Sequence, residues 1–192
     1  MEASTLSDLT VAEYLSIERE HDQRYEYHDG FIYALAGGSI NHGVISSNVS
    51  GELRDKIREN GKDCRPLIAD VKVHIASSNS YLYPDVMVVC GDIETAEENK
   101  ESITNPVLII EVLSESTASY DRGDKFHKYR QLPSLVDYVL IEQTSQQVDV
   151  FHRDQGGELW KISSFTGGEV HLASLDLTLA LEALYEGVVF EE

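Results

Sequence analysis

Two carboxylates and a lysine stand where they could support hydrolysis of a phosphodiester. Asp85 lies near the start of the apolar run 83–89, Glu111 interrupts a second apolar run at 107–113, and Lys125 follows in a basic segment. Carboxylates on adjacent strands can hold Mg²⁺ and leave room for water and phosphate. A nearby ammonium can stabilise negative charge that develops on the phosphate. The spacing therefore indicates a divalent-metal site. The alternative interpretation, that the two acidic residues are an incidental pair at solvated strand ends, stays open.

The elements that must position these residues follow from the apolar pattern. Asp29-Gly30 lies between two aromatic and β-branched runs, which predicts a β-hairpin over 24–34 with Glu26 on its first strand. Thr10 and Glu13 have the spacing of a helix capping box. Apolar periodicity predicts further helices over 41–60, 118–132 and 179–185, and strands over 69–75, 83–90, 107–113, 136–141, 147–152 and 159–164. The sequence thus predicts one α/β (α+β) domain over 1–192.

Charge restricts the partners. The 192 residues carry 15 Lys plus Arg against 34 Asp plus Glu, a formal net charge of -19. Most of such a surface repels a polyanion, which counts against tight, non-specific binding of nucleic acid. A nuclease remains compatible with this charge, because a local cluster such as Arg122, Lys125, Lys128 and Arg130 can contact phosphate.

The cysteines and the apolar runs indicate the cellular compartment in which the protein is expected. Cys64 and Cys90 show no metal-type spacing and are expected to be free thiols in a reducing compartment, although they could pair. The acidic first 30 residues do not have the pattern of a signal peptide. No apolar run approaches the roughly 20 residues of a membrane span. We expect a soluble, cytoplasmic protein without a membrane partner.

A series of short motifs resembles the Uma-type family of restriction endonucleases, in the PD-(D/E)XK nuclease superfamily. The motifs cover nearly the whole chain, about 10–188: Tyr25-Glu26-Tyr27, Asp29-Gly30, Ser39-Ile40-Asn41-His42, Tyr83-Pro84-Asp85, Ile110-Glu111-Val112-Leu113-Ser114, Ser116-Thr117, Asp121-Arg122 and Lys125 to Tyr129. The resemblance implies a restriction-endonuclease-like fold, in which a mixed central β-sheet is flanked by α-helices. It also implies a divalent-metal nuclease site.

The resemblance assigns roles to individual residues. Asp85 matches the Asp of the PD motif and Glu111 matches the (D/E) position, so both would bind Mg²⁺ or Mn²⁺ with the backbone carbonyl of Val112. The motif lysine would fall at 113, where this chain has Leu113, and Lys125 on the following helix is the expected substitute. Glu26 would supply a preceding acidic residue, as a further metal ligand or a base that positions water.

Three other residues have both a functional and a structural interpretation. His42 at a helix start could contact phosphate or transfer a proton, or it could bond a neighbouring loop. Lys128 could contact phosphate, although a solvated surface lysine is the commoner case. Asp70 could join the acidic cluster or could serve a turn. Of these, His42 and Lys128 are the nucleic-acid contacts that the sequence predicts.

Two classes of function follow. The first is a Mg²⁺- or Mn²⁺-dependent endonuclease that hydrolyses phosphodiester bonds of nucleic acid, with DNA as the expected substrate, and that forms a homodimer if it cuts both strands of a duplex. The second is a catalytically silent nucleic-acid- or protein-binding module on the same scaffold, suggested by the acidity and by Leu113.

Overall fold

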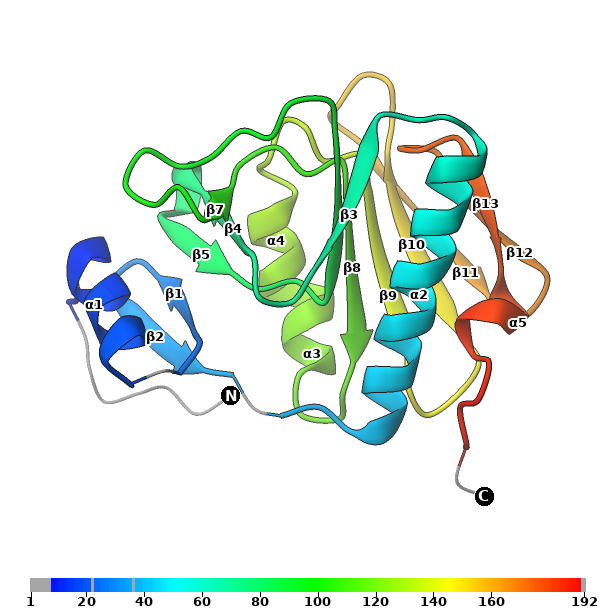
Figure 1. The fold of residues 1–192 in the computed structure, drawn as a ribbon, viewed down its shortest axis with the longest axis horizontal. Coiled ribbons are helices and arrows are strands. Elements are labelled where there is room, and N and C mark those ends of the chain that lie inside the picture. The colour runs from blue at the N-terminus through cyan, green and yellow to red at the C-terminus, as the bar shows by residue number, and fades with distance from the viewer. Residues whose placement is uncertain (1–7, 22, 36, 191–192) are drawn as a thin grey trace.

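The computed structural model describes residues 8–21, 23–35 and 37–190, which form mixed sheets flanked by helices (Figure 1). The helices are α1 Val11–His21, α2 Ile40–Glu59, α3 Ala118–Tyr120, α4 Phe126–Tyr129 and α5 Leu181–Leu184, with the 3-10 turn η1 Ala76–Ser78 and the π-helical turn η2 Asp121–Lys125. The strands are β1 Tyr25–His28, β2 Phe31–Ala34, β3 Cys64–Ile68, β4 Lys72–Ile75, β5 Ser80–Leu82, β6 Val86–Cys90, β7 Ser102–Ile103, β8 Leu108–Leu113, β9 Asp137–Glu142, β10 Val148–Arg153, β11 Trp160–Phe165, β12 Glu169–Leu172 and β13 Leu177–Ala180.

A 6-stranded sheet in the order β11-β10-β9-β8-β6-β3 forms the centre. Its middle strand β8 is buried along its whole length, as the continuous apolar run predicts. β8 pairs in parallel with β9 and antiparallel with β6, so the sheet is mixed. A second, 5-stranded sheet in the order β2-β1-β5-β4-β7 lies beside it, on the left in Figure 1.

Helix α2 covers one face of the central sheet. Ser39 caps it by accepting a hydrogen bond from the backbone N–H of His42, and Gly61, with a φ of +61°, follows its C-terminal end. Its buried side chains recur at every fourth position: Ile45, Val49, Leu53 and Ile57. They pack against strand residues and against α5 and the β12-β13 hairpin. Burial of each is worth about 1.5–3 kcal/mol, so this face alone anchors the helix.

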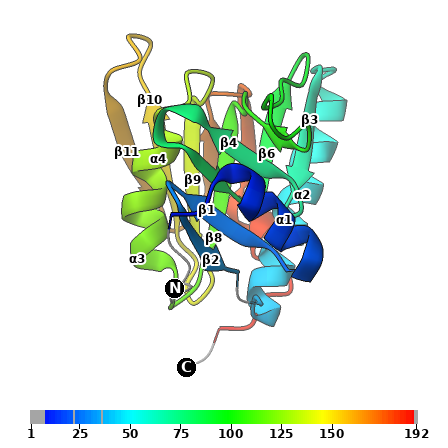
Figure 2. The ribbon, with the colours of Figure 1, turned by 90° about the vertical axis from the view of Figure 1, so that its left-hand side faces the viewer.

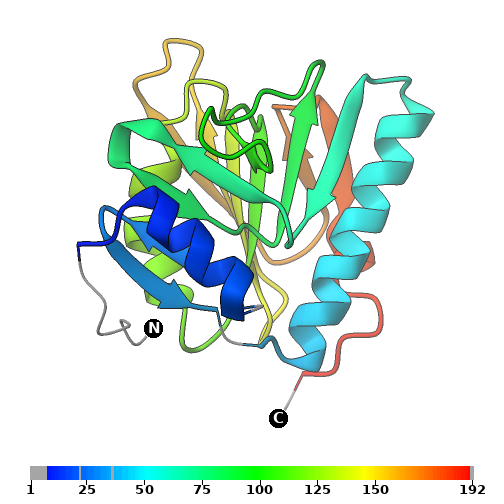
Figure 3. The same cartoon turned by 60° about the vertical axis from the view of Figure 1, so that its left-hand side comes forward.

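The opposite face carries the continuous helical segment α3-η2-α4 and the second sheet. Figure 2 shows this segment and α2 on opposite sides of the central strands. Phe126 and Tyr129 pack there against Ile109 and Leu113 of β8. Helix α1 packs on the β1-β2 hairpin through a cluster of tyrosines that includes Tyr14 and Tyr27 (Figure 3). Glu26 of β1 therefore faces the α3-η2-α4 side of the central sheet.

Several predicted elements are confirmed, and others were wrong. The Thr10–Glu13 capping box forms, with the backbone N–H of Thr10 donating to Glu13 Oε2 at 2.8 Å. Strands β3, β12 and β13 were not predicted. Strands β5 and β7 lie between the predicted elements and were also not predicted. The expected helix 118–132 contains the π-helical turn η2 and its helical hydrogen bonding ends near Tyr129.

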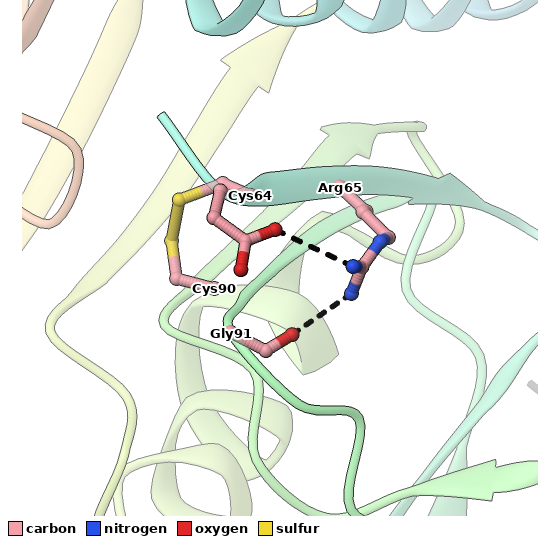
Figure 4. Close-up of a disulfide and its surroundings, with 5 residues drawn as sticks. Cys64, Arg65, Cys90 and Gly91 are labelled. Carbon is pink, nitrogen blue, oxygen red and sulfur yellow. Dashed lines mark hydrogen bonds and ion pairs between the residues drawn. A yellow bond between two sulfur atoms is a disulfide. The ribbon is translucent and has the colours of Figure 1, made fainter. Parts of the chain in front are cut away.

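The expectation of free thiols was wrong. Cys64 and Cys90 form a disulfide, because they lie directly opposite each other at one end of the antiparallel β3-β6 pair (Figure 4). Arg65 bonds the carbonyl of Gly91 at 2.8 Å beside it. Without knowledge of β3, the sequence could not predict that the two residues face each other. Every helix within the described residues is too short or too polar to cross a lipid bilayer.

Candidate active site

Asp85 lies at the point where the central sheet opens. The β6-β8 pairing ends at Val86 and Ile110, and Asp85 is the next residue of that strand. Its Oδ2 accepts a hydrogen bond from the backbone N–H of Val112 at 2.7 Å. A side chain thus replaces the missing backbone partner of Val112 and links the start of β6 to the end of β8. The N–H and C=O of one strand residue face the same neighbour in an antiparallel ladder, so the carbonyl of Val112 faces this side too.

Glu111 is the one charged residue of the buried strand β8, with 3% of its surface exposed. Side chains alternate along a strand, so Glu111 shares a face with Ile109 and Leu113. Leu113 is 1% exposed and packs in the apolar cluster of that face. The cation that Leu113 cannot provide comes from the helical segment, because Lys125 Nζ lies 2.9 Å from Glu111 Oε1.

Lys125 draws further carboxylates together. Its Nζ also lies 3.2 Å from Glu26 Oε1 and 3.6 Å from Asp121 Oδ1. The Glu26 side chain is 1% exposed, and its other oxygen accepts a hydrogen bond from the hydroxyl of Tyr120 at 3.2 Å. Because Glu26 and Glu111 contact the same nitrogen atom, one ammonium is the counter-charge for both carboxylates.

The electrostatics of the cluster follow from one buried ammonium among several carboxylates. Burial raises the pKa of Glu111 well above its ordinary value, although Lys125 opposes this. Burial also raises the pKa of Asp121. Burial alone would lower the pKa of Lys125, but Glu111 and Glu26 outweigh it and raise that pKa well above its ordinary value. The ammonium is therefore held in its charged form, and Glu111 and Asp121 bind protons more readily than exposed carboxylates.

His42 joins the site from the first turn of α2. Its Nε2 lies 3.1 Å from Asp85 Oδ2. The hydrogen bond with Asp85 raises the pKa of His42, against the effect of burial. The contact that the structure shows for His42 is therefore with Asp85, the carboxylate that the sequence predicts as a metal ligand.

The donor set fits a divalent cation in one specific respect. Glu111 Oε1 is buried and forms no hydrogen bond of normal geometry to a described residue, so only the charge of Lys125 compensates it. A carboxylate oxygen can accept more than one partner, so Glu111 Oε1 can take a cation beside Lys125. Among the described residues, no three His, Cys, Asp or Glu side chains converge as a ready-made metal cage. Asp85, Glu111 and a backbone carbonyl suit Mg²⁺, which keeps several waters and often takes one or two carboxylates.

The structure changes the interpretation of two residues, Asp70 and Lys128. Asp70 does not join the cluster, because its side chain is 80% exposed and pairs with Arg24. The alternative interpretation of Lys128 as a solvated surface lysine was wrong, since only 8% of its surface is exposed, and its contact with phosphate stays a prediction. Its Nζ lies 3.4 Å from the hydroxyl of Tyr120, because the helical segment turns that face toward β1 and not toward solvent.

Sequence reasoning also missed two residues that belong to the site. Asp121 contacts Lys125, and the four-residue separation on a helix could have predicted that contact. Tyr120 bonds Glu26, a residue 94 positions away, and no sequence signal indicates this. Both lie at or beside the π-helical turn η2, a type of turn frequent at functional sites.

Comparisons with known proteins show the family to which this chain belongs. Residues 11–184 match the model of the Uma2 family, described as "Putative restriction endonuclease". An uncharacterized protein of Synechocystis sp., slr1290, is 38% identical over 183 residues, which cover 95% of this chain and 94% of that protein. A second Synechocystis protein, sll1609, is 35% identical over 167 residues, covering 87% and 93%.

A solved structure shows the same fold. The crystal structure of "a putative nuclease belonging to DUF820" from Anabaena variabilis superposes with a TM-score of 0.74 and 18% identity, covering 94% of this chain and 99% of that one. The resemblance inferred from the motifs is therefore confirmed, and so is the mixed sheet flanked by helices. The chain belongs to the Uma2 family of restriction-endonuclease-like proteins.

Proposed function

We propose that this protein is a divalent-metal-dependent endonuclease that hydrolyses phosphodiester bonds of nucleic acid, with DNA as the expected substrate. One observation carries the proposal. Where β6 and β8 separate, Asp85 accepts a hydrogen bond from the N–H of Val112, the neighbour of Glu111, and a buried ammonium, Lys125, lies against Glu111. Membership of the Uma2 family supports the same class of chemistry.

The residues that would hold Mg²⁺ or Mn²⁺ are Asp85, Glu111 and the backbone carbonyl of Val112. When bound, the cation supplies positive charge that polarises the phosphate and acidifies water. Asp85 is held in place by the N–H of Val112 and by His42, so its orientation is set before any ligand arrives. Glu111 is fixed by its position in the middle of a buried sheet. Rigid support of this kind lowers the cost of ordering a site.

Lys125 and Glu26 have supporting roles in this proposal. The ammonium of Lys125 offsets the repulsion among the carboxylates and is close enough to Glu111 to stabilise charge on a phosphate bound there. Both oxygens of Glu26 already have partners: the N–H of Tyr83 and Lys125 on one, the hydroxyl of Tyr120 on the other. Glu26 is therefore better suited to position Lys125 than to bind the metal directly. His42, charged more readily because of Asp85, is a phosphate contact.

The silent binding module remains as a second candidate because one observation favours it. Lys125 already contacts three carboxylates, and Leu113 stands in the usual position of the lysine. Calorimetry with Mn²⁺ separates the two candidates, since a nuclease should bind the ion at a site that Asp85→Asn removes. A two-fold homodimer stays a prediction for an enzyme that cuts both strands of a duplex, and the measured mass in solution tests it.

The direct test is cleavage by a Glu111→Gln variant. Single-stranded and duplex DNA and RNA are incubated with Mn²⁺ and the purified protein, and products are resolved on a gel. The wild type should cut, and Glu111→Gln should lose at least about 100-fold in rate, since it removes the charged oxygen but keeps the shape. Exposed Glu115, four residues along, provides the matched control Glu115→Gln. Absence of any cleavage by the wild type, or full activity in Glu111→Gln, would refute the proposal.

A further inference from the structure

A cavity of about 530 Å³ lies beside the carboxylate cluster. The lining residues that matter here are His28, Tyr33, Tyr120, Asp124, His127 and Lys128. They come from the β1-β2 hairpin and from the α3-η2-α4 segment, which face each other across the opening. The cavity is within the range of about 300–1,000 Å³ typical of small-molecule sites, so it is large enough for more than a phosphate ion.

Lys128 is the unusual group in this cavity. Its residue is 8% exposed, yet it forms no ion pair with a carboxylate in the part of the chain that the structure describes. Its contacts are the hydroxyl of Tyr120 at 3.4 Å and the ring of Tyr120, whose centroid is 4.9 Å away. Burial lowers the pKa of Lys128, against the opposing effect of Asp124 and Glu26. Because neither carboxylate forms an ion pair with its ammonium, Lys128 can bind an anion in the cavity.

The cavity and the proposed active site share a wall. The hydroxyl of Tyr120 accepts from Lys128 on the cavity side and donates to Glu26 Oε2 at 3.2 Å on the other. Glu26 in turn contacts Lys125, which contacts Glu111. Tyr120, Glu26 and Lys125 would therefore separate a ligand at Lys128 from a phosphate held at Asp85 and Glu111.

The remaining lining residues favour a planar group attached to one phosphate. Four aromatic side chains line the cavity, Tyr33, Tyr120, His28 and His127, and stacking of a base on an aromatic ring is worth about 1–3 kcal/mol. Asp124 lines the same cavity, and its negative charge opposes a second phosphate. A protein of net charge -19 attracts an anion only where a local cation is available, as Lys128 is here.

We propose that this cavity is a subsite for one unpaired nucleotide of the substrate strand, with its phosphate at Lys128 and its base against the rings of Tyr33 and His28. The subsite rests on the proposed nuclease function and narrows its substrate to nucleic acid that offers a single-stranded or displaced nucleotide. A base stacked inside a duplex cannot enter such a cavity unless it leaves the stack.

The test is binding of dTMP, thymidine and inorganic phosphate in the presence of EDTA, measured by calorimetry or NMR titration of the full chain. dTMP should bind, and thymidine and inorganic phosphate should each bind at least tenfold more weakly. Lys128→Met and Tyr33→Ser should each weaken dTMP binding at least tenfold, while Lys161→Met, on an exposed position of β11, should leave it unchanged. Absence of saturable dTMP binding at millimolar concentration, equal binding of phosphate, or normal binding by Lys128→Met would overturn the subsite.

Two further measurements separate this subsite from misfolding and from the nuclease proposal. Lys128→Met removes a buried charge that forms no ion pair with a described residue, so its thermal midpoint should stay close to that of the wild type, and a large decrease would contradict the absence of a direct internal partner. Glu111→Gln should bind dTMP as the wild type does. If Glu111→Gln is inactive while Lys128→Met binds dTMP and cuts single strands normally, the nuclease stands and the subsite is wrong.

Discussion

Replacement of Lys125 by methionine should expose how much the protein depends on one buried ammonium. The Lys125 side chain is 7% exposed, and the carboxylates it contacts, Glu26, Glu111 and Asp121, are 1%, 3% and 4% exposed. Methionine has a similar length and keeps the packing, so the change isolates the charge. The variant leaves the carboxylates buried without a cation.

Two effects determine how much stability Lys125→Met loses. Removal of one partner of a buried ion pair costs about 3–5 kcal/mol, and the upper end applies here because three carboxylates share the cation. Proton uptake then limits the loss, since burial already raises the pKa of Glu111 and Asp121 and the loss of Lys125 raises both further. A carboxyl whose pKa is raised in the folded state is more stable protonated. The variant should therefore be most stable at low pH and lose about 1.4 kcal/mol per pH unit for each extra proton as the pH rises.

Urea unfolding between pH 5 and pH 8 measures this. At pH 8 the midpoint of Lys125→Met should lie about 2 M below that of the wild type, for a typical dependence on urea concentration. The difference should become smaller toward pH 5, while the exposed control Lys161→Met should follow the wild type throughout. Equal midpoints at pH 8, or a difference that does not vary with pH, would refute the idea that an ionised cluster surrounds Lys125.

Two more outcomes follow from the same structure. Burial raises the pKa of Glu111, so protons compete with a divalent cation for this carboxyl as the pH falls. Mn²⁺ affinity should therefore increase with pH, which calorimetry at several pH values measures; affinity independent of pH would contradict this. The double variant Cys64→Ala/Cys90→Ala, which opens a bridge between residues separated by 26 positions, should lose about 2–4 kcal/mol of stability in urea. Its Mn²⁺ binding should not change, because Asp85 lies beyond the opposite end of β6, and unchanged stability would mean that the thiols are not paired.

The local pattern of the sequence was sufficient for the elements that carry a strong apolar period or a cap. Helix α2 has apolar residues at every fourth position and a serine cap, and β8 is a continuous apolar run. Strand β3 was missed because its burial is partial and it contains Pro66, which weakens the strand signal. The short β12 and β13 were missed where a helix signal followed closely.

Part of the candidate site could also be predicted from local sequence pattern. Asp85 and Glu111 could be identified from sequence, because a carboxylate inside or beside a buried apolar run costs free energy and requires a reason. Membership of the family could be inferred from the order of short motifs and was confirmed. That Asp85 and Glu111 bind one metal ion together stays a prediction, which the proposed cleavage assay and calorimetry will test.

Only the tertiary structure decided which charges meet. Glu26 and Lys125 are 99 positions apart in the numbering printed above, yet the packing of the β1-β2 hairpin against the helical segment brings them into contact. The same packing buries Lys128 and leaves it facing a cavity, and it closes the bridge between Cys64 and Cys90. Sequence sets the type of each side chain and its local backbone. The burial and the neighbours that shift pKa values depend on contacts between distant segments, which local pattern does not determine.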